Sequence, residues 1–170
     1  PPLALDHDLA RALRTLFTLR SLRRIRPHAP LPADVWLPDT QVMVARSRSG
    51  SEKGFTIAVK GGHNAESHNH NDVGNFILYA DGLPVLIDVG VETYSRKTFG
   101  ADRYTIWTMQ SPYHNVPTVG DVPQAQGRAF GAAAVRYAKN GRHTVLSMDL
   151  SGAYPPEAGL SAWRRTLRLE

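Results

Sequence analysis

The sequence has 170 residues, of which 42% are hydrophobic and 21% charged, a composition typical of one folded domain or of part of a larger protein. It contains no cysteine, which excludes disulfide scaffolds, thiolate zinc fingers and cysteine nucleophiles. No apolar run reaches the roughly 20 residues that a membrane-spanning helix needs, so we expect no membrane span.

The excess of positive charge lies near the N-terminus. The net charge is +5, and residues 1–26 contribute most of it through six arginines against two aspartates. A basic segment can bind nucleic acid, but this one coincides with a single predicted helix and lacks the interleaved aromatic residues of a base-stacking surface. A solvated helix face is therefore the favoured interpretation, and we expect no nucleic-acid partner.

Residues 6–25 are predicted to form a helix, because apolar residues recur on one face at Leu9, Leu13, Leu16 and Phe17. The segment 27–38 holds four prolines and predicts a linker or extended crossover. We therefore divide the chain into residues 1–38, a helix with a proline-rich linker, and residues 39–170, a second domain.

The second domain has the period-two hydrophobicity of strands. We expect strands at Val42–Arg46, Phe55–Lys60, Phe76–Ala80, Pro84–Val89, Val116–Val119, Arg128–Tyr137, Thr144–Leu150 and Trp163–Leu169. Asp81-Gly82 is the strongest hairpin turn among them. The predicted fold class is mainly β, an antiparallel β-sandwich preceded by one N-terminal helix. The last strand pattern runs to the end of the sequence, so we expect this domain to be truncated there.

A cluster of histidines follows the second predicted strand. In an extended backbone the alternation His68-Asn69-His70 would place both imidazoles on one face. Asp88 ends an apolar strand, where a carboxylate is better suited to a ligand than to a core, and His114 is a third candidate. Two imidazoles and one carboxylate form a common zinc site, although iron or manganese also fits. Histidines that only hydrogen-bond within a loop are the alternative, and the residues alone leave both open.

Other residues near this cluster are candidates for supporting roles. Cations can pair with carboxylates or sulfates of a ligand and aromatic rings can pack against it, which makes ligand-binding candidates of Tyr94, Arg96, Arg103 and Tyr104. Glu66 and Asn71 are candidates for orienting His68 and His70 by hydrogen bonds to their rings. For each the alternative is an ordinary loop or packing role, and we expect Trp107 in the core.

The stretch SHNHNDVGNFILYADGLPVLIDVGVETY (Ser67–Tyr94), followed by SPYHNVPTV (Ser111–Val119), resembles the heparinase II/III family of polysaccharide lyases, which includes oligoalginate lyases. The family pattern is His-x-His-x-Asp-x-Gly-x-Phe, a hairpin carrying Asp-Gly, an apolar strand ending in Asp-x-Gly, a tyrosine, and later His-Asn. All of these elements occur here in that order.

The resemblance implies an architecture. In this family an (α/α) toroid precedes β-sandwich layers. Residues 1–38 would then be the exit helix and linker of a toroid, and residues 39–170 the heparinase II/III-like β-sandwich domain.

The resemblance also implies a chemistry and the residues that serve it. Such lyases cleave uronic-acid-containing glycans, including glycosaminoglycans and alginate, by β-elimination. By motif, His70, Asp88 and His114 match the ligands of a bracing metal, usually zinc, and His68 matches the catalytic histidine that faces the substrate. The family's catalytic tyrosine and carboxylate-neutralising residue lie in the toroid, so we expect this chain alone to be inactive. An acidic polysaccharide partner and a periplasmic or secreted location are also implied.

Two other classes of function remain open. One is a non-catalytic carbohydrate-binding or structural module that keeps the metal as a brace. The other is a metal-dependent hydrolase or cupin-like enzyme, against which the His-x-His-x-Asp spacing and the Asp-x-Gly strand end argue.

Overall fold

The computed structural model describes residues 9–26, 30–141 and 143–170, and the chain forms two compact units that divide between Pro30 and Leu31. Among its described residues the first unit contains one helix, α1 (Leu9–Leu22). The predicted helix over 6–25 is confirmed in its central part, and residues 6–8 lie outside the described residues. With 14 residues α1 is too short to cross a bilayer, and no other described helix is long and apolar enough to do so.

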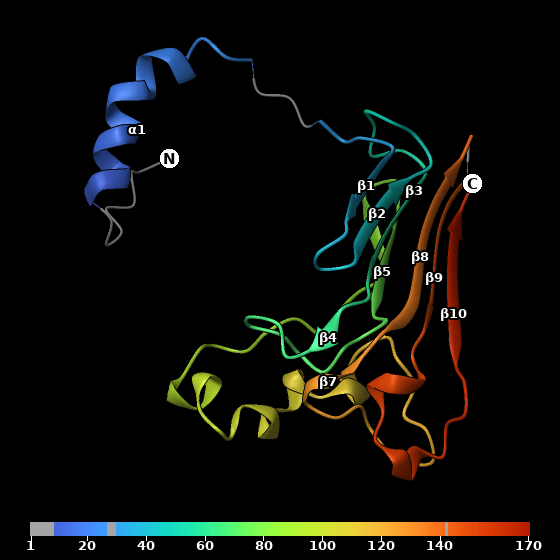
Figure 1. Ribbon diagram of the computed structural model, residues 1–170. Coiled ribbons are helices and arrows are strands. Elements are labelled where there is room, and N and C mark those ends of the chain that lie inside the picture. The colour runs from blue at the N-terminus through green and yellow to red at the C-terminus, as the bar shows by residue number, and fades with distance from the viewer. Residues whose placement is uncertain (1–8, 27–29, 142) are drawn as a thin grey trace. The chain divides into compact units, whose positions relative to one another are not determined.

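The second unit is built on two antiparallel sheets that face each other (Figure 1). The five-stranded sheet has the order β1 (Asp34–Leu37), β2 (Val42–Arg46), β3 (Phe55–Lys60), β5 (Phe76–Ala80) and β6 (Leu83–Leu86). The three-stranded sheet has the order β10 (Arg164–Leu169), β9 (His143–Asp149) and β8 (Ala133–Asn140). A short third sheet pairs β4 (His63–Asn64) with β7 (Gly127–Gly131).

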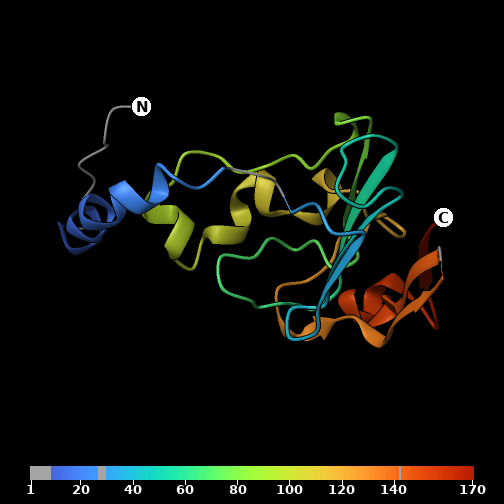
Figure 2. The ribbon, with the colours of Figure 1, turned by 90° about the horizontal axis from the view of Figure 1, so that it is seen from above.

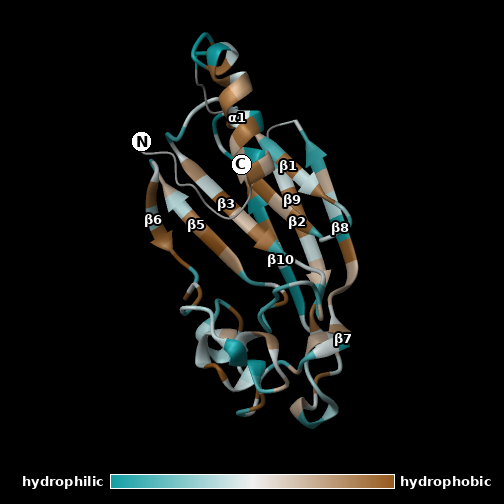
Figure 3. Ribbon diagram, turned by 90° about the vertical axis from the view of Figure 1, so that its left-hand side faces the viewer, coloured by the Kyte–Doolittle hydropathy of each residue, from teal (hydrophilic) through white to brown (hydrophobic). Residues whose placement is uncertain are grey.

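The core lies between the two large sheets because every second side chain of the inner strands points inward. One buried apolar cluster joins side chains of both sheets, among them Met43, Ala45, Ile57, Val59, Leu146 and Met148. Strands β3 and β6 are largely hydrophobic (Figure 3), but β6 is an exposed edge strand, whereas β3 lies inside its sheet. The predicted mainly-β sandwich with one N-terminal helix is confirmed.

Local patterns predicted several strands well. Strands β2 and β3 have the predicted bounds, and β5 and β6 form the predicted hairpin. Its turn residues Asp81 and Gly82 have φ of 52° and 78°, the left-handed conformation that this dipeptide tolerates.

Three expectations about secondary structure were wrong. The segment 27–38, predicted as a linker or extended crossover outside the β-domain, contains β1, which pairs with β2, and the β-unit begins at Leu31 rather than at residue 39. The strand predicted at Arg128–Tyr137 is two strands, because β7 pairs with β4 while β8 pairs with β9. Val116–Val119 forms no strand; Val119 makes a single bridge to Val122 across a turn.

The segment between β6 and β7 positions the candidate site. It contains four 3-10 turns: η1 (Arg96–Phe99), η2 (Arg103–Thr105), η3 (Trp107–Met109) and η4 (Ser111–Tyr113). The first two extend away from the sheets (Figures 1 and 2). Trp107, predicted in the core, is 46% exposed and packs edge-on against Tyr113, so that prediction was wrong.

Candidate functional site

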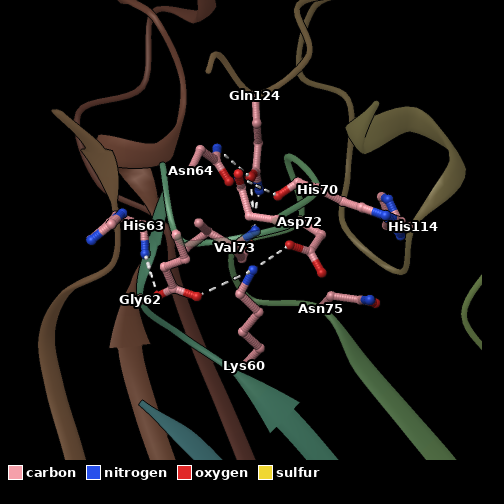
Figure 4. Close-up of polar contacts among 12 residues, drawn as sticks. Lys60, Gly62, His63, Asn64, His70, Asp72, Val73, Asn75, His114 and Gln124 are labelled. Carbon is pink, nitrogen blue, oxygen red and sulfur yellow. Dashed lines mark hydrogen bonds and ion pairs between the residues drawn. The ribbon is translucent and has the colours of Figure 1, made fainter. Parts of the chain in front are cut away.

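Three separate segments bring His70, Asp88 and His114 together. His70 precedes β5, Asp88 follows β6 and His114 follows η4. Their candidate ligand atoms all lie within 4.8 Å of one another. The rings of His70 and His114 are 5.2 Å apart between centroids, and His70 points toward His114 (Figure 4). The three residues predicted as metal ligands thus form one cluster.

The hydrogen bonds of His114 suit a metal ligand. Its Nε2 lies 3.0 Å from the Thr108 carbonyl oxygen, which can only accept, so Nε2 carries the proton. Its Nδ1 lies 2.6 Å from Asp88 Oδ2. The Nδ1 of the imidazole therefore turns toward the carboxylate of the cluster, while Nε2 is held by the backbone. A histidine that donates one N–H to a backbone carbonyl and turns its other nitrogen to the cluster is typical of metal sites.

The protonation states of the other two residues also fit a cation. Burial opposes ionisation of Asp88, but the bond with His114 and those from Gly90 and Asn75 outweigh it and lower the pKa of Asp88 to about 2. Burial lowers the pKa of His70, and the neighbouring His114 lowers it further. An ionised carboxylate and a neutral imidazole are the forms that bind a divalent metal.

Two asparagines hold the ligand-bearing segments in place. Asn75 Nδ2 donates to Asp88 Oδ2 at 2.6 Å, while Asn75 Oδ1 accepts from the Asn115 N–H at 3.1 Å. Asn115 Nδ2 donates to the carbonyls of Phe76 and Ile87, at 2.8 and 3.0 Å. Because Ile87 precedes Asp88 and Asn115 follows His114, this pair ties both ligands to β5. Both asparagines lie inside the motif segments, but the sequence alone predicts no role for either.

The loop that carries the histidines is anchored by a buried glutamine and an ion pair (Figure 4). Gln124, 3% exposed, exchanges hydrogen bonds with the backbone N–H and carbonyl of Val73 and accepts one from Asn64 Nδ2. Lys60 Nζ lies 2.6 Å from Asp72 Oδ1. The loop is therefore fixed near both of its ends, on either side of His68 and His70.

His68 does not share a face with His70, so the expectation of an extended backbone was wrong. His68 has a φ of 57° and lies in a turn. Its exposed ring packs against Phe99, at 5.5 Å between centroids, and near Tyr94, at 6.2 Å. The turn sends the two imidazoles to different neighbours, His70 to the ligand cluster and His68 to a pocket.

That pocket has a volume of about 370 Å³ and brings several predicted residues together. Its lining is formed by Ala65, Glu66, Ser67, His68, Asn69, Thr98, Phe99, Gly100, Arg103 and Tyr104. Tyr94 lies at its side against His68 and Phe99, whereas Arg96 is exposed on η1 and does not line the pocket. His68, Arg103 and Tyr104 therefore line the same cavity, as residues that contact one ligand must.

The two residues predicted to orient the histidines have other partners. Glu66 accepts a hydrogen bond from the His63 N–H and lies 3.8 Å from Lys60 Nζ. The Asn71 N–H donates to the Met109 carbonyl, and its buried Oδ1 has no partner. Their role in orienting His68 and His70 stays a prediction.

A family model described as "Heparinase II/III-like, C-terminal" matches residues 29–169. The chain belongs to the heparinase II/III-like family. The motif segments that carry the resemblance contain all three residues of the cluster and, among the residues that line the pocket, His68. No curated protein matches the chain.

Solved structures of this heparinase type share the fold of the chain. A heparinase III with methylated lysines has a TM-score of 0.63 at 18% identity, over 92% of this chain and 24% of that one. The heparan sulfate lyase HepC from Pedobacter heparinus has a TM-score of 0.63 at 18% identity, over 94% of this chain and 24% of HepC. Another heparinase III has a TM-score of 0.58 at 19% identity, over 83% of this chain and 21% of that protein. The chain therefore spans about a quarter of the length of these neighbours.

Proposed function

We propose that this chain is the β-domain of a polysaccharide lyase that cleaves uronic-acid-containing glycans by β-elimination. The observation that carries the proposal is the juxtaposition of His68, in a pocket, with the cluster of His70, Asp88 and His114, inside a match to the C-terminal domain of the family. The names of the structural neighbours, heparinase III and heparan sulfate lyase, are consistent with it.

The proposed reaction breaks the bond between C4 of a uronate and the glycosidic oxygen. A base removes the C5 proton, the electron pair forms a C4–C5 double bond, and the C4–O bond breaks as an acid protonates the departing oxygen. The C5 proton is only weakly acidic, so the enzyme must stabilise the negative charge that builds up on the carboxylate. An acidic polysaccharide or oligosaccharide is thus the proposed partner.

We assign His68 to the reacting part of the substrate, as base or as orienting group. Its ring is exposed on the pocket and is held by aromatic contacts rather than by the ligand cluster. Tyr94, Arg96 and Tyr104 remain proposed substrate contacts, since phenol and guanidinium groups can bind hydroxyl and carboxylate oxygens. The guanidinium of Arg103, also a proposed contact, is occupied by backbone carbonyls.

The proposed cofactor is a divalent cation, with zinc as the first choice. His70, Asp88 and His114 would hold it, and their donor set and hydrogen bonds fit that role. When bound, the cation would brace the three segments against one another. The chemistry of proton transfer is left to the side chains around the pocket.

The rest of the active site is proposed to lie in a helical toroid, which would supply the tyrosine and the carboxylate neutraliser. The chain by itself is then expected to bind metal without useful turnover. A periplasmic or secreted location is part of the same proposal, on the basis of the family alone.

The decisive experiment measures the ultraviolet absorbance of the C4–C5 unsaturated product. The full-length gene product is incubated with heparan sulfate, alginate and other uronate polymers, with the 170-residue chain in parallel. The proposal expects a rise with the full-length protein on at least one polymer and none with the chain alone. Binding of these polymers by the full-length protein without any rise would favour the non-catalytic module, and a rise with the chain alone would disprove the need for the toroid.

A further inference from the structure

Asn69, between His68 and His70, is held by all of its polar groups. Its N–H donates to the Glu66 carbonyl at 3.3 Å, and its side-chain Nδ2 donates to the His70 carbonyl at 3.0 Å. Its Oδ1 accepts from the Tyr104 hydroxyl at 2.8 Å. Its carbonyl accepts from Arg103. Asn69 is only 8% exposed, and these bonds hold it in place between two histidines whose rings have different neighbours.

Arg103 is the charged donor among these contacts. Its Nε and Nη2 lie 3.2 and 2.6 Å from the Asn69 carbonyl oxygen, and its Nη1 lies 2.6 Å from the carbonyl of the buried Thr98. The planar guanidinium thereby joins the histidine loop to η1, which carries Phe99. A lysine has one point donor and cannot reproduce this two-carbonyl bridge.

The bridge matters because the backbone at His68 is unfavourable. A residue with a Cβ is disfavoured at a φ of 57°, and it stays there only where its neighbours fix it. The neighbour that is fixed is Asn69. The same bridge holds Phe99 beside His68, since Thr98 directly precedes Phe99 and the two rings lie 5.5 Å apart.

We propose that Arg103 is a positioning residue that acts through Asn69 and Thr98. It holds the His68 ring toward Phe99 and the pocket while His70 is left to face His114 and Asp88. Its effect on turnover rests on the proposed lyase function, whereas its effect on the His68 ring does not. The competing role is direct binding of a substrate carboxylate or sulfate by the Arg103 charge.

The first test uses NMR of the 170-residue chain and needs no activity. The ring of Phe99, edge-on to His68, shifts the His68 imidazole proton resonances and gives nuclear Overhauser contacts to them. In Arg103→Ala we expect the His68 resonances to lose the ring-current shift and the Overhauser contacts to Phe99, with the metal content unchanged. Arg103→Lys should fail to restore them, and Arg48→Ala, which changes an exposed arginine in the turn between β2 and β3, should leave them intact. A folded Arg103→Ala protein whose His68 resonances keep both the ring-current shift and the Overhauser contacts to Phe99 would overturn the proposal.

Tyr104→Phe keeps the proposal testable if the Arg103 variants do not fold. It removes only the hydrogen bond to Asn69 Oδ1, and the His68 signals should move in the same direction by a smaller amount. Unchanged signals in Tyr104→Phe, with both Arg103 variants unfolded, would also count against the proposal.

The second test separates positioning from substrate binding in the full-length protein. Misplacing a reacting group can cost on the order of 10²-fold in rate. A positioning role predicts that Arg103→Ala and Arg103→Lys both lower kcat by about this factor with KM nearly unchanged. A raised KM that Lys rescues would instead assign Arg103 to the substrate. If the full-length protein cleaves no polymer, the lyase proposal fails while the NMR test still decides the role of Arg103.

Discussion

The ring of Trp36 lies flat against the ring of Tyr137, with centroids 5.2 Å apart and an angle of 1° between their planes. Trp36 belongs to β1, an edge strand of the five-stranded sheet, and Tyr137 belongs to β8, an edge strand of the three-stranded sheet. On the same strands the carboxylate of Asp34 accepts hydrogen bonds from the Tyr137 hydroxyl and from Lys139. These contacts close one side of the sandwich at the edge strand that begins the β-unit.

Loss of the Asp34 carboxylate should therefore destabilise the domain. We expect Asp34→Asn to lower the free energy of unfolding at neutral pH by about 1 kcal/mol, because a hydrogen bond to a charged group is lost at a partly buried site. Denaturant unfolding measures this change. Asp39→Asn is the matched control, since Asp39 is exposed, and an equal loss in both variants would remove the special role of Asp34.

The pH dependence of stability follows from the same contacts. The hydrogen bonds from Lys139 and Tyr137 lower the pKa of Asp34 below its ordinary 3.8, so its stabilisation is complete above that pH and is lost as the pH falls below it. Burial, with the bond to Asp34, raises the pKa of Tyr137 from 10.0 to about 12, so its contribution is lost as the pH rises through that interval. In Asp34→Asn the part of the fall in stability at acid pH that comes from this site should vanish. The fall in stability between pH 10 and about 12 should become smaller. If Asp34→Asn loses as much stability at acid pH as the unmodified protein, the role of Asp34 in this pH dependence is contradicted.

The sequence predicted those parts of the fold that depend on neighbouring residues in the chain. The Asp81-Gly82 turn and the alternation in β2 and β3 specify their hairpin and strands without help from distant residues. β1 was missed because prolines flank it, and an edge strand tolerates prolines that a central strand does not. The break between β7 and β8 is a change of sheet, which is set by distant pairing partners and leaves no local pattern.

The candidate site shows the same division. His70, Asp88 and His114 were predicted because each lies in a motif segment, and their convergence is confirmed. The turn at His68 was missed because the contacts that hold its neighbour Asn69 come from Arg103 and Tyr104 in η2, more than 30 residues away in the chain. The pair of Asn75 and Asn115 was missed for a similar reason, since neither amide has a recognisable role until the fold places it beside a ligand.

Removal of His70 should cost both metal and stability. Protein purified without added metal is expected to contain a stoichiometric divalent transition metal by elemental analysis. His70→Ala should lose it and show a lower Tm, while His68→Ala should keep the metal and most of the Tm, because a brace couples metal binding to folding. Absence of any stoichiometric metal in the unmodified protein would overturn the metal proposal.

Asn75 is expected to tune the metal site without touching the metal. Its Nδ2 orients the carboxylate of Asp88, so Asn75→Ala should weaken metal affinity about 10–100-fold, the usual cost of losing such a partner. A competition titration with a chelator measures the affinity. Asn71→Ala serves as the comparison, because the Oδ1 of Asn71 has no partner. Equal weakening in both variants would restore the orienting role that the sequence suggested for Asn71.

His68 should be needed for turnover and dispensable for metal. It sits two residues from a ligand, but the left-handed turn directs its ring to Phe99 and the pocket rather than to Asp88 and His114. A proton-transfer or orienting histidine typically contributes on the order of 10²–10⁴ in rate. We therefore expect His68→Ala in the full-length protein to lose activity by about that factor, with the metal content unchanged. Activity and elemental analysis must be measured on the same preparation, with Arg48→Ala as a control for surface substitution. Loss of metal would mean that His68 and His70 bind it as a pair, and full turnover with metal retained would exclude His68 from the reaction.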